Sequence, residues 1–192
     1  YSTGMIGKWH QGLVGEKDPP ADTDLIGGPT DHGFDHYFGI PASLDIPPYY
    51  FIQNKRPVEM PTGTIEDREG TAPAPGKRKI QGPFFRGGKI SPDYVHEEVL
   101  GRFGDEAVQF IENQDNQHNA TPYFLYLALP SPHTPWLPDE AHRGKSGAGD
   151  YGDFTLQVDD LVGRVLAAIE SNRDPDNTLV IFASDNGPVW YP

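Results

Sequence analysis

Residues 178–188 read TLVIFASDNGP, and this stretch decides the fold class predicted for the chain. The run 178–183 is apolar, contains β-branched and aromatic residues, and is flanked by turn formers. These features are typical of a buried strand of a parallel sheet, and such sheets occur almost only in α/β proteins. We therefore predict a strand at 178–183 in an α/β fold.

Two side chains that carry oxygen, Asp185 and Asn186, follow where this strand is expected to end. Ligands of open α/β sheets bind just beyond the carboxyl ends of the strands, so this is a favourable place for a site. A carboxylate beside a carboxamide suits a hard cation such as Ca²⁺ or Mg²⁺. Asp-Asn-Gly is also a common tight-turn signal, and the stretch taken alone favours the turn.

A second buried strand is predicted at 123–129, and it leads into a loop in which four prolines surround His133. A lone histidine in a loop is often incidental, but here a stiff loop holds it just past a strand. Apolar residues at helical spacing follow over 151–171. Strand, helix and the strand at 178–183 make a βαβ unit, whose crossover should be right-handed. This topology places His133 and Asp185 at the same edge of the sheet.

Residues 7–12, GKWHQG, carry a lysine and a histidine two positions apart. If 7–10 is extended, Lys8 and His10 point to the same side of the chain. A lysine and a histidine in one cleft make an anion site with a titratable partner. The alternative is an exposed loop in which the two residues are incidental.

The middle of the chain contains a predicted hairpin at 49–59, a long surface loop at 61–92 and a helix from about 93 to about 113. Ser91 and Pro92 suit the start of that helix. The loop is rich in proline, glycine and basic residues, including 77–79 and Arg86. Its basic residues are either solvated or help to attract an anionic substrate.

The composition excludes several classes of protein. The formal net charge of −13 argues against a nucleic-acid binder, which needs a basic face. The 192 residues contain no cysteine, so disulfides, thiolate metal sites and cysteine nucleophiles are excluded. The 22 glycines and 20 prolines predict long irregular connections in a chain that is still long enough for one folded domain.

The three motifs, GKWHQG at 7–12, PHTP at 132–135 and SDNGP at 184–188, occur in an order that resembles the type I sulfatase family. The stretch 31–39, DHGFDHYFG, is also similar to that family, so the resemblance runs along the whole chain. It implies an alkaline-phosphatase-like α/β fold, in which a largely parallel sheet lies between helices. It also implies hydrolysis of sulfate esters by a formylglycine beside a bound Ca²⁺, with Mg²⁺ as the alternative cation.

The resemblance implies roles only where residues match. Lys8 would hold the sulfate, and His10 would support the formylglycine hydrate in releasing it. His133 would contact the ester oxygen and help the leaving group to depart. Asp185 and Asn186 would form part of the Ca²⁺ site, and Ser43 matches a polar position that lines the pocket.

Three family features are absent from the chain: the Cys/Ser-x-Pro/Ala-x-Arg motif that becomes formylglycine, the paired acidic metal ligands of the first strand, and a lysine beyond the Asp-Asn-Gly turn. In the family the first two precede the matching stretch and the third follows it. We therefore expect residues 1–192 to be the central part of one catalytic domain, truncated at both ends and inactive alone. The formylglycine is expected on a residue outside it.

Two alternatives remain open from the sequence. A phosphoesterase of the same superfamily would use a Thr or Ser nucleophile and two metals, whereas the Lys-Trp-His cluster of residues 8–10 favours the sulfatase. A relative without activity would only bind sulfated glycans. The expected substrate is an aryl or carbohydrate sulfate ester. The family resemblance further implies an exported protein of the periplasm, cell surface or lysosome, and no targeting signal is seen in the chain.

Overall fold

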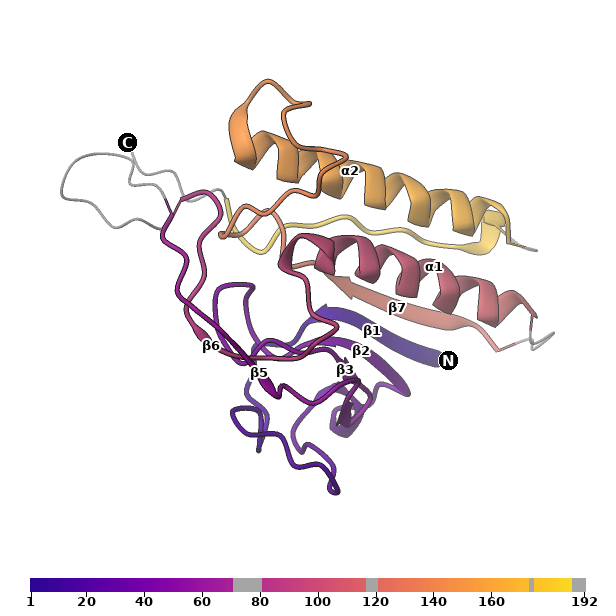
Figure 1. Ribbon diagram of the computed structural model, residues 1–192. Coiled ribbons are helices and arrows are strands. Elements are labelled where there is room, and N and C mark those ends of the chain that lie inside the picture. Colours follow the sequence, from indigo (N-terminus) through magenta and orange to yellow (C-terminus); the bar gives the residue numbers. More distant parts are fainter. Residues whose placement is uncertain (71–80, 117–120, 173–174, 188–192) are drawn as a thin grey trace.

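The computed structural model describes residues 1–70, 81–116, 121–172 and 175–187 (Figure 1). Its main sheet has five strands in the order β4-β3-β2-β1-β7. Their bounds are β1 Ser2–Lys8, β2 His36–Ile40, β3 Ile52–Gln53, β4 Arg56–Pro57 and β7 Tyr123–Ala128. The α/β class is therefore confirmed. A strand is also present where one was expected at 123–129, but none of the residues of β7 is buried, so the prediction of a buried strand there is wrong.

The centre of the sheet is parallel, as predicted. Strand β1 pairs in parallel with β2 on one side and with β7 on the other. The register places Lys8 beside Ile40 and Gly7 beside Ala128, so the carboxyl ends of all three strands lie at one edge. At Gly7 the backbone has φ of +124°, and a Cβ would lie 2.0 Å from the carbonyl oxygen of Ala128. Only glycine lets the two strands approach in this way.

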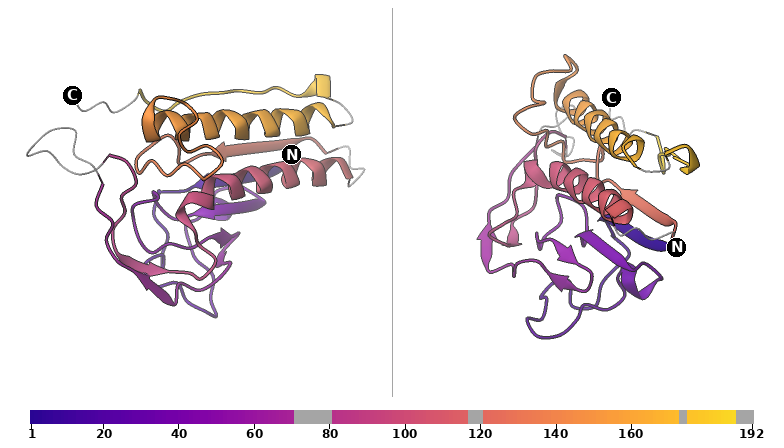
Figure 2. Two further views of the ribbon diagram at one scale, coloured as in Figure 1. Left: turned by 45° about the horizontal axis from the view of Figure 1, so that its top comes forward. Right: turned by 90° about the vertical axis from the view of Figure 1, so that its right-hand side faces the viewer.

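Two long helices cover one face of the sheet (Figure 2). They are α1, Val99–Asn116, and α2, Gly149–Glu170; the two helices pack against each other, and α1 lies against β1, β2 and β7. The core between sheet and helices includes Ile6, Phe38, Phe103 and Phe154. Among the described residues, no helix has the length and apolar character needed to cross a membrane.

The start of α1 differs from the prediction, which placed it near residue 93. A 3-10 turn, His96–Glu98, precedes the helix, and Ser91 Oγ donates to Asp93 Oδ1 at 2.7 Å instead of capping backbone N–H groups. Asp93 Oδ2 also accepts a hydrogen bond from Arg102 Nη1 at 3.1 Å. These tertiary contacts use the polar groups that the sequence suggested for the cap, so the helix begins later.

The opposite face of the sheet is covered by irregular chain in the described residues. Met5, Tyr37, Tyr50 and Ile52 form a second buried cluster with Leu13 and Leu25 from the loop after β1. A short 3-10 turn, Pro29–Asp31, lies in this loop, and another, Pro175–Asn177, follows α2. This cover does not extend over all of β7, where Phe124 and Tyr126 are each 52% exposed.

The buried strand predicted at 178–183 is wrong for the described chain. These residues run in the direction of β7 but belong to no strand (Figures 1 and 2). Leu179 is 85% exposed and Phe182 is 77% exposed. A buried parallel strand needs a hydrogen-bonded neighbour and cover on both faces. Phe124 and Tyr126 of β7 are themselves half exposed, so the described chain does not supply that cover.

The stretch 61–92, predicted to be a surface loop, is more structured than expected. Strand β5, Gly63–Ile65, pairs antiparallel with β6, Gly88–Ile90, and Phe84 and Phe85 are each only 9% exposed. The basic residues 77–79 lie outside the described residues. The hairpin predicted at 49–59 is confirmed as β3 and β4, which turn at Asn54 with φ of +56°.

Candidate active site

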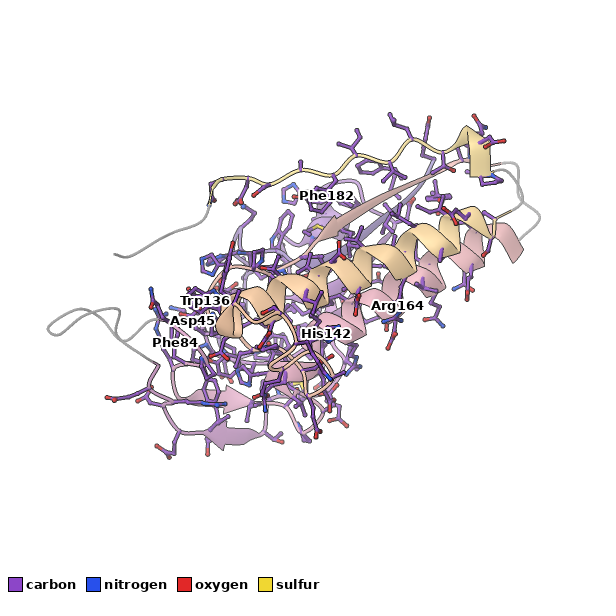
Figure 3. The ribbon with its side chains drawn as sticks, turned by 90° about the horizontal axis from the view of Figure 1, so that it is seen from above. Asp45, Phe84, Trp136, His142, Arg164 and Phe182 are labelled. Carbon is purple, nitrogen blue, oxygen red and sulfur yellow. The ribbon has the colours of Figure 1, made fainter. Side chains whose placement is uncertain are left out.

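Polar side chains follow the carboxyl ends of β1, β2 and β7 at the same edge of the sheet. This is the edge at which the sequence predicted a site, and the loops that bear Asp45, Phe84 and Trp136 meet there (Figure 3). The candidate residues are Lys8, His10, Ser43, Asp45, His133, Asp185 and Asn186.

The chain after β1 places Lys8 and His10 close together, but not by remaining extended. The strand ends at Lys8, and His10 adopts a left-handed backbone with φ of +53°. The backbone N–H of His10 donates to the carbonyl of Pro41 at 2.9 Å, which holds this conformation against the loop after β2. A left-handed conformation of a residue other than glycine costs about 1–3 kcal/mol and often occurs at functional sites. The extended backbone that was considered for residues 7–10 therefore ends at Lys8.

Trp9, between the two site residues, points into the loop that follows. Its indole Nε1 donates to the carbonyl oxygens of Gly12 and Gly27, at 3.2 and 3.1 Å. Its ring also lies 5.6 Å from the ring of His32. Trp9 therefore stabilises the loop that follows β1, while its neighbours Lys8 and His10 belong to the candidate site.

The charge of Lys8 is influenced by burial and by two carboxylates. Burial lowers the pKa of Lys8, and Asp185 and Asp45 act in the opposite direction by favouring its charged form. Asp185 comes from the far end of the chain and Asp45 from the loop after β2. The two carboxylates thus oppose the effect of burial without reversing it, and the pKa of Lys8 stays below its usual value.

His10 has the opposite tendency. Burial lowers the pKa of His10, and the nearby positive groups Lys8 and His133 lower it further. Asp45 and Glu16 oppose this shift without reversing it. A histidine with a lowered pKa is mostly neutral near pH 7 and can accept a proton. The influence of His133 on His10 also indicates that the loops after β1 and β7 approach each other.

The loop after β2 brings two buried polar residues to this edge. Ser43 is 5% exposed, and its carbonyl accepts the N–H of Ile46 at 3.0 Å in a tight turn. Asp45 is 6% exposed, and its Oδ2 lies 3.3 Å from Arg86 Nη2. The sequence analysis selected Ser43 and missed Asp45. The signal was present, because an acidic residue inside an apolar run has to find a positive partner.

His133 is exposed in the proline-rich loop after β7. Its Nδ1 lies 2.5 Å from the carbonyl oxygen of Thr134. Since a carbonyl only accepts, Nδ1 carries the proton and Nε2 is left to act on another molecule. The loop is held by the buried Leu137 and by Trp136, whose N–H donates to the carbonyl of Gly82 at 3.0 Å.

Asp185 and Asn186 are exposed, and their surroundings agree with both interpretations of this stretch. Ser184 Oγ donates to the carbonyl of Asn186 at 2.6 Å, and Asn186 Nδ2 donates to the carbonyl of Gly187 at 2.7 Å, which are local turn contacts. Asp185 also lies within electrostatic reach of Lys8. The two side chains fit Ca²⁺ in kind but not in number, because such ions take six to eight oxygen ligands. The described residues contain no cluster of three or more metal-binding side chains.

The sequence model of the Sulfatase family matches residues 1–192. The chain belongs to the sulfatase family. An N-acetylgalactosamine-6-O-sulfatase of Bacteroides thetaiotaomicron is 34% identical over 217 residues, covering 98% of this chain and 41% of that protein. Arylsulfatase A of Bos taurus is 32% identical over 192 residues, covering 98% of this chain and 33% of that protein.

Solved structures agree with this family membership. A Bacteroides thetaiotaomicron sulfatase connected with the metabolism of multiple glycosaminoglycans superposes with a TM-score of 0.73 at 29% identity, covering 98% of this chain and 43% of that one. A sulfatase of Pseudoalteromonas has a TM-score of 0.58 at 19% identity, which shows likeness of fold alone. The chain spans between a third and about two fifths of the relatives named here.

Proposed function

We propose that the protein hydrolyses sulfate esters of sulfated carbohydrates or aryl alcohols. The observation that carries this proposal is the convergence of Lys8, His10 and His133 at the carboxyl edge of a parallel sheet in a sulfatase-family chain. Cleaving a sulfate ester requires positive charge near the sulfuryl oxygens and a proton for the leaving oxygen. These three side chains are suited to supply both.

Each of the three has a role that follows from its surroundings. Lys8, with its charge favoured by Asp45 and Asp185, binds the sulfate group. His10, with its pKa lowered, accepts and holds a proton during release of sulfate. His133 presents Nε2, because its Nδ1 is bonded to the Thr134 carbonyl, and it acts at the ester oxygen. Ser43 is proposed to line the pocket beside them.

The proposed reaction also needs a metal ion and a nucleophile, and these 192 residues do not supply all of the groups required for either. Asp185 and Asn186 are proposed to contribute oxygen ligands to a Ca²⁺ site, together with further ligands, because their donor chemistry suits a hard cation. When bound, such an ion stabilises negative charge on the sulfuryl oxygens. A formylglycine on a residue outside these 192 is proposed as the nucleophile, since the chain has neither a cysteine nor a serine in the Cys/Ser-x-Pro/Ala-x-Arg motif from which it forms.

The test compares two lysine variants of the full-length protein. Lys8→Met should reduce kcat/KM for an aryl or sugar sulfate by roughly a hundredfold or more, as expected for loss of charge at the reacting group. Lys55→Met is the matched control. Lys55 pairs with Asp31 at 2.5 Å in the turn between β3 and β4, near the amino end of β2 and away from the site. It should change the rate less than about threefold, as expected for an exposed pair.

Several outcomes would contradict the proposal. Full activity in Lys8→Met would remove Lys8 from the site. Faster hydrolysis of the phosphate ester than of the matched sulfate ester would identify a phosphoesterase instead. Binding of sulfated glycans with no release of sulfate would identify a binding protein. An exported location is also proposed on the family resemblance, and cell fractionation tests it.

A further inference from the structure

Arg86 lies beside Asp45, a buried polar residue of the candidate site, and its backbone is held by hydrogen bonds. Its backbone N–H donates to the carbonyl of Asp45 at 3.3 Å, and its own carbonyl accepts the hydroxyl of Tyr49 at 2.7 Å. Tyr49 is 2% exposed, so this contact belongs to the core. The segment that carries Arg86 is thus held from both sides, independently of the arginine side chain.

The side chain of Arg86 combines a buried contact with an exposed head. Nη2 lies 3.3 Å from Asp45 Oδ2, and the two side chains are 62% and 9% exposed, respectively. A guanidinium has five N–H donors in a planar fork, so one contact at this distance uses only a small part of its capacity. The group can therefore bind a further anion while Asp45 restrains it.

Arg86 also borders the site where the sulfate is proposed to bind. Asp45, its partner, acts electrostatically on both Lys8 and His10. The loop that carries His133 is joined to the loop that carries Arg86 by the hydrogen bond from Trp136 N–H to the Gly82 carbonyl, at 3.0 Å. Asp45, Phe84 and Trp136 lie at the same end of the molecule (Figure 3).

We propose that Arg86 binds a second anionic group of the substrate, next to the sulfate ester that is cleaved. The substrate class is a sulfated glycan that carries either a uronate carboxylate or a second sulfate on the neighbouring sugar. This inference rests on the proposed sulfatase function. Carboxylates and sulfates both present paired oxygens that fit the arginine fork.

The charge of the chain supports this assignment. A protein with a formal net charge of −13 repels polyanions over most of its surface, so binding one requires cations concentrated at the site. Lys8 supplies one such charge at the reacting group. Arg86 supplies a second on the exposed side of Asp45, where a neighbouring sugar would lie. A purely structural role explains less, since backbone contacts already hold this segment.

The test measures substrate preference in the full-length protein. Three disaccharides carry the same sulfate ester and differ in the neighbouring sugar, which is neutral, a uronic acid, or sulfated. The readout is the ratio of kcat/KM for each doubly charged substrate to that for the singly charged one. Arg86→Ala should lower this ratio roughly ten- to hundredfold, the range expected for a charge-assisted hydrogen bond, and Arg86→Lys should restore part of it. The substrate whose ratio falls identifies the anion.

Arg56→Ala is the matched control. Arg56 pairs with Asp24 at 2.9 Å and is 54% exposed, but it lies on β4 at the far edge of the sheet. Its loss should leave the ratio unchanged. A ratio that Arg86→Ala does not alter for either doubly charged substrate would overturn the inference, as would a wild-type ratio of one or less.

Failure of the proposed function is a separate result. If the wild-type protein released sulfate from none of the three substrates, the sulfatase proposal would fall. Calorimetric binding of the same glycans would then still test Arg86. Weaker binding of a doubly charged glycan by Arg86→Ala than by wild type would support the inference, and equal binding would overturn it.

Discussion

Acid should destabilise this fold through one buried histidine, His96. The residue is 5% exposed, and its ring stacks on Phe85 with ring centres 4.3 Å apart and lies 4.4 Å from the ring of Tyr49. Its Nε2 has no hydrogen-bond partner. Burial in this aromatic surrounding lowers the pKa of His96 from 6.5 to about 4. The folded protein is therefore more stable with a neutral His96 imidazole than with a charged one.

The sign and size of the effect follow from linkage. Because the pKa is lower in the folded state than in the unfolded state, the unfolded chain binds the proton more readily. The contribution to stability is present above pH 6.5 and is lost as the pH falls from 6.5 to about 4. The whole difference corresponds to about 3 kcal/mol, of which about 2 kcal/mol is lost between pH 7 and pH 4.5.

The assay is urea unfolding of wild type and His96→Phe at pH 7 and at pH 4.5. At pH 7 the variant should be less stable by about 1 kcal/mol, since it loses the hydrogen bond to the Leu44 carbonyl. At pH 4.5 it should be the more stable protein, because phenylalanine does not titrate. His32→Phe, at an exposed position, serves as the control. If wild type and His96→Phe lose the same free energy of unfolding between the two pH values, the reasoning is refuted.

Two further predictions concern the sheet and the loop before α2. Gly7→Ala should cost about 3 kcal/mol or more in unfolding free energy, since its Cβ would lie 2.0 Å from the Ala128 oxygen; a loss below about 1 kcal/mol in urea unfolding would contradict this. Burial alone would lower the pKa of His142, but hydrogen bonds to Asp139 and Asp160, at 2.6 and 2.7 Å, raise it instead. Its stabilisation of the loop 139–148 should therefore be lost as the pH rises through that raised pKa. Amide protection factors should show this in wild type and not in His142→Gln.

The sequence predicted the elements whose patterns are local. Helix α2 was expected at 151–171 and spans Gly149–Glu170, because its apolar stripe is long and uninterrupted. Strand β7 was predicted from its short run of apolar and aromatic residues, which is also a local pattern. The start of α1 was misplaced because Ser91 bonds to Asp93 rather than to the helix backbone. The run 178–183 was recognised as apolar, but whether such a run pairs depends on neighbours that its own sequence does not describe.

Some residues of the candidate site were also predicted from the sequence, and others were found only in the structure. His133 and Asp185 were predicted to lie at one edge of the sheet because the carboxyl ends of parallel strands in a βαβ unit share that edge. Lys8 and His10 were expected beside them only from the family resemblance. Asp45 and Arg86 were not paired by the sequence analysis. They are 41 positions apart, and no periodicity links them; only the approach of the segment before β6 to the loop after β2 brings them together.

The amino-acid sequence by itself determined the α/β class, the two long helices and the presence of lysine and histidine side chains that can bind and hydrolyse an anionic ester. These are consequences of local hydrophobic period and side-chain chemistry. The tertiary structure alone decided the left-handed backbone of His10, the carboxylate of Asp45 placed between site and surface, and the exposed position of 178–183. Each of these depends on contacts between segments far apart in the chain, where burial and charge are set by the neighbours.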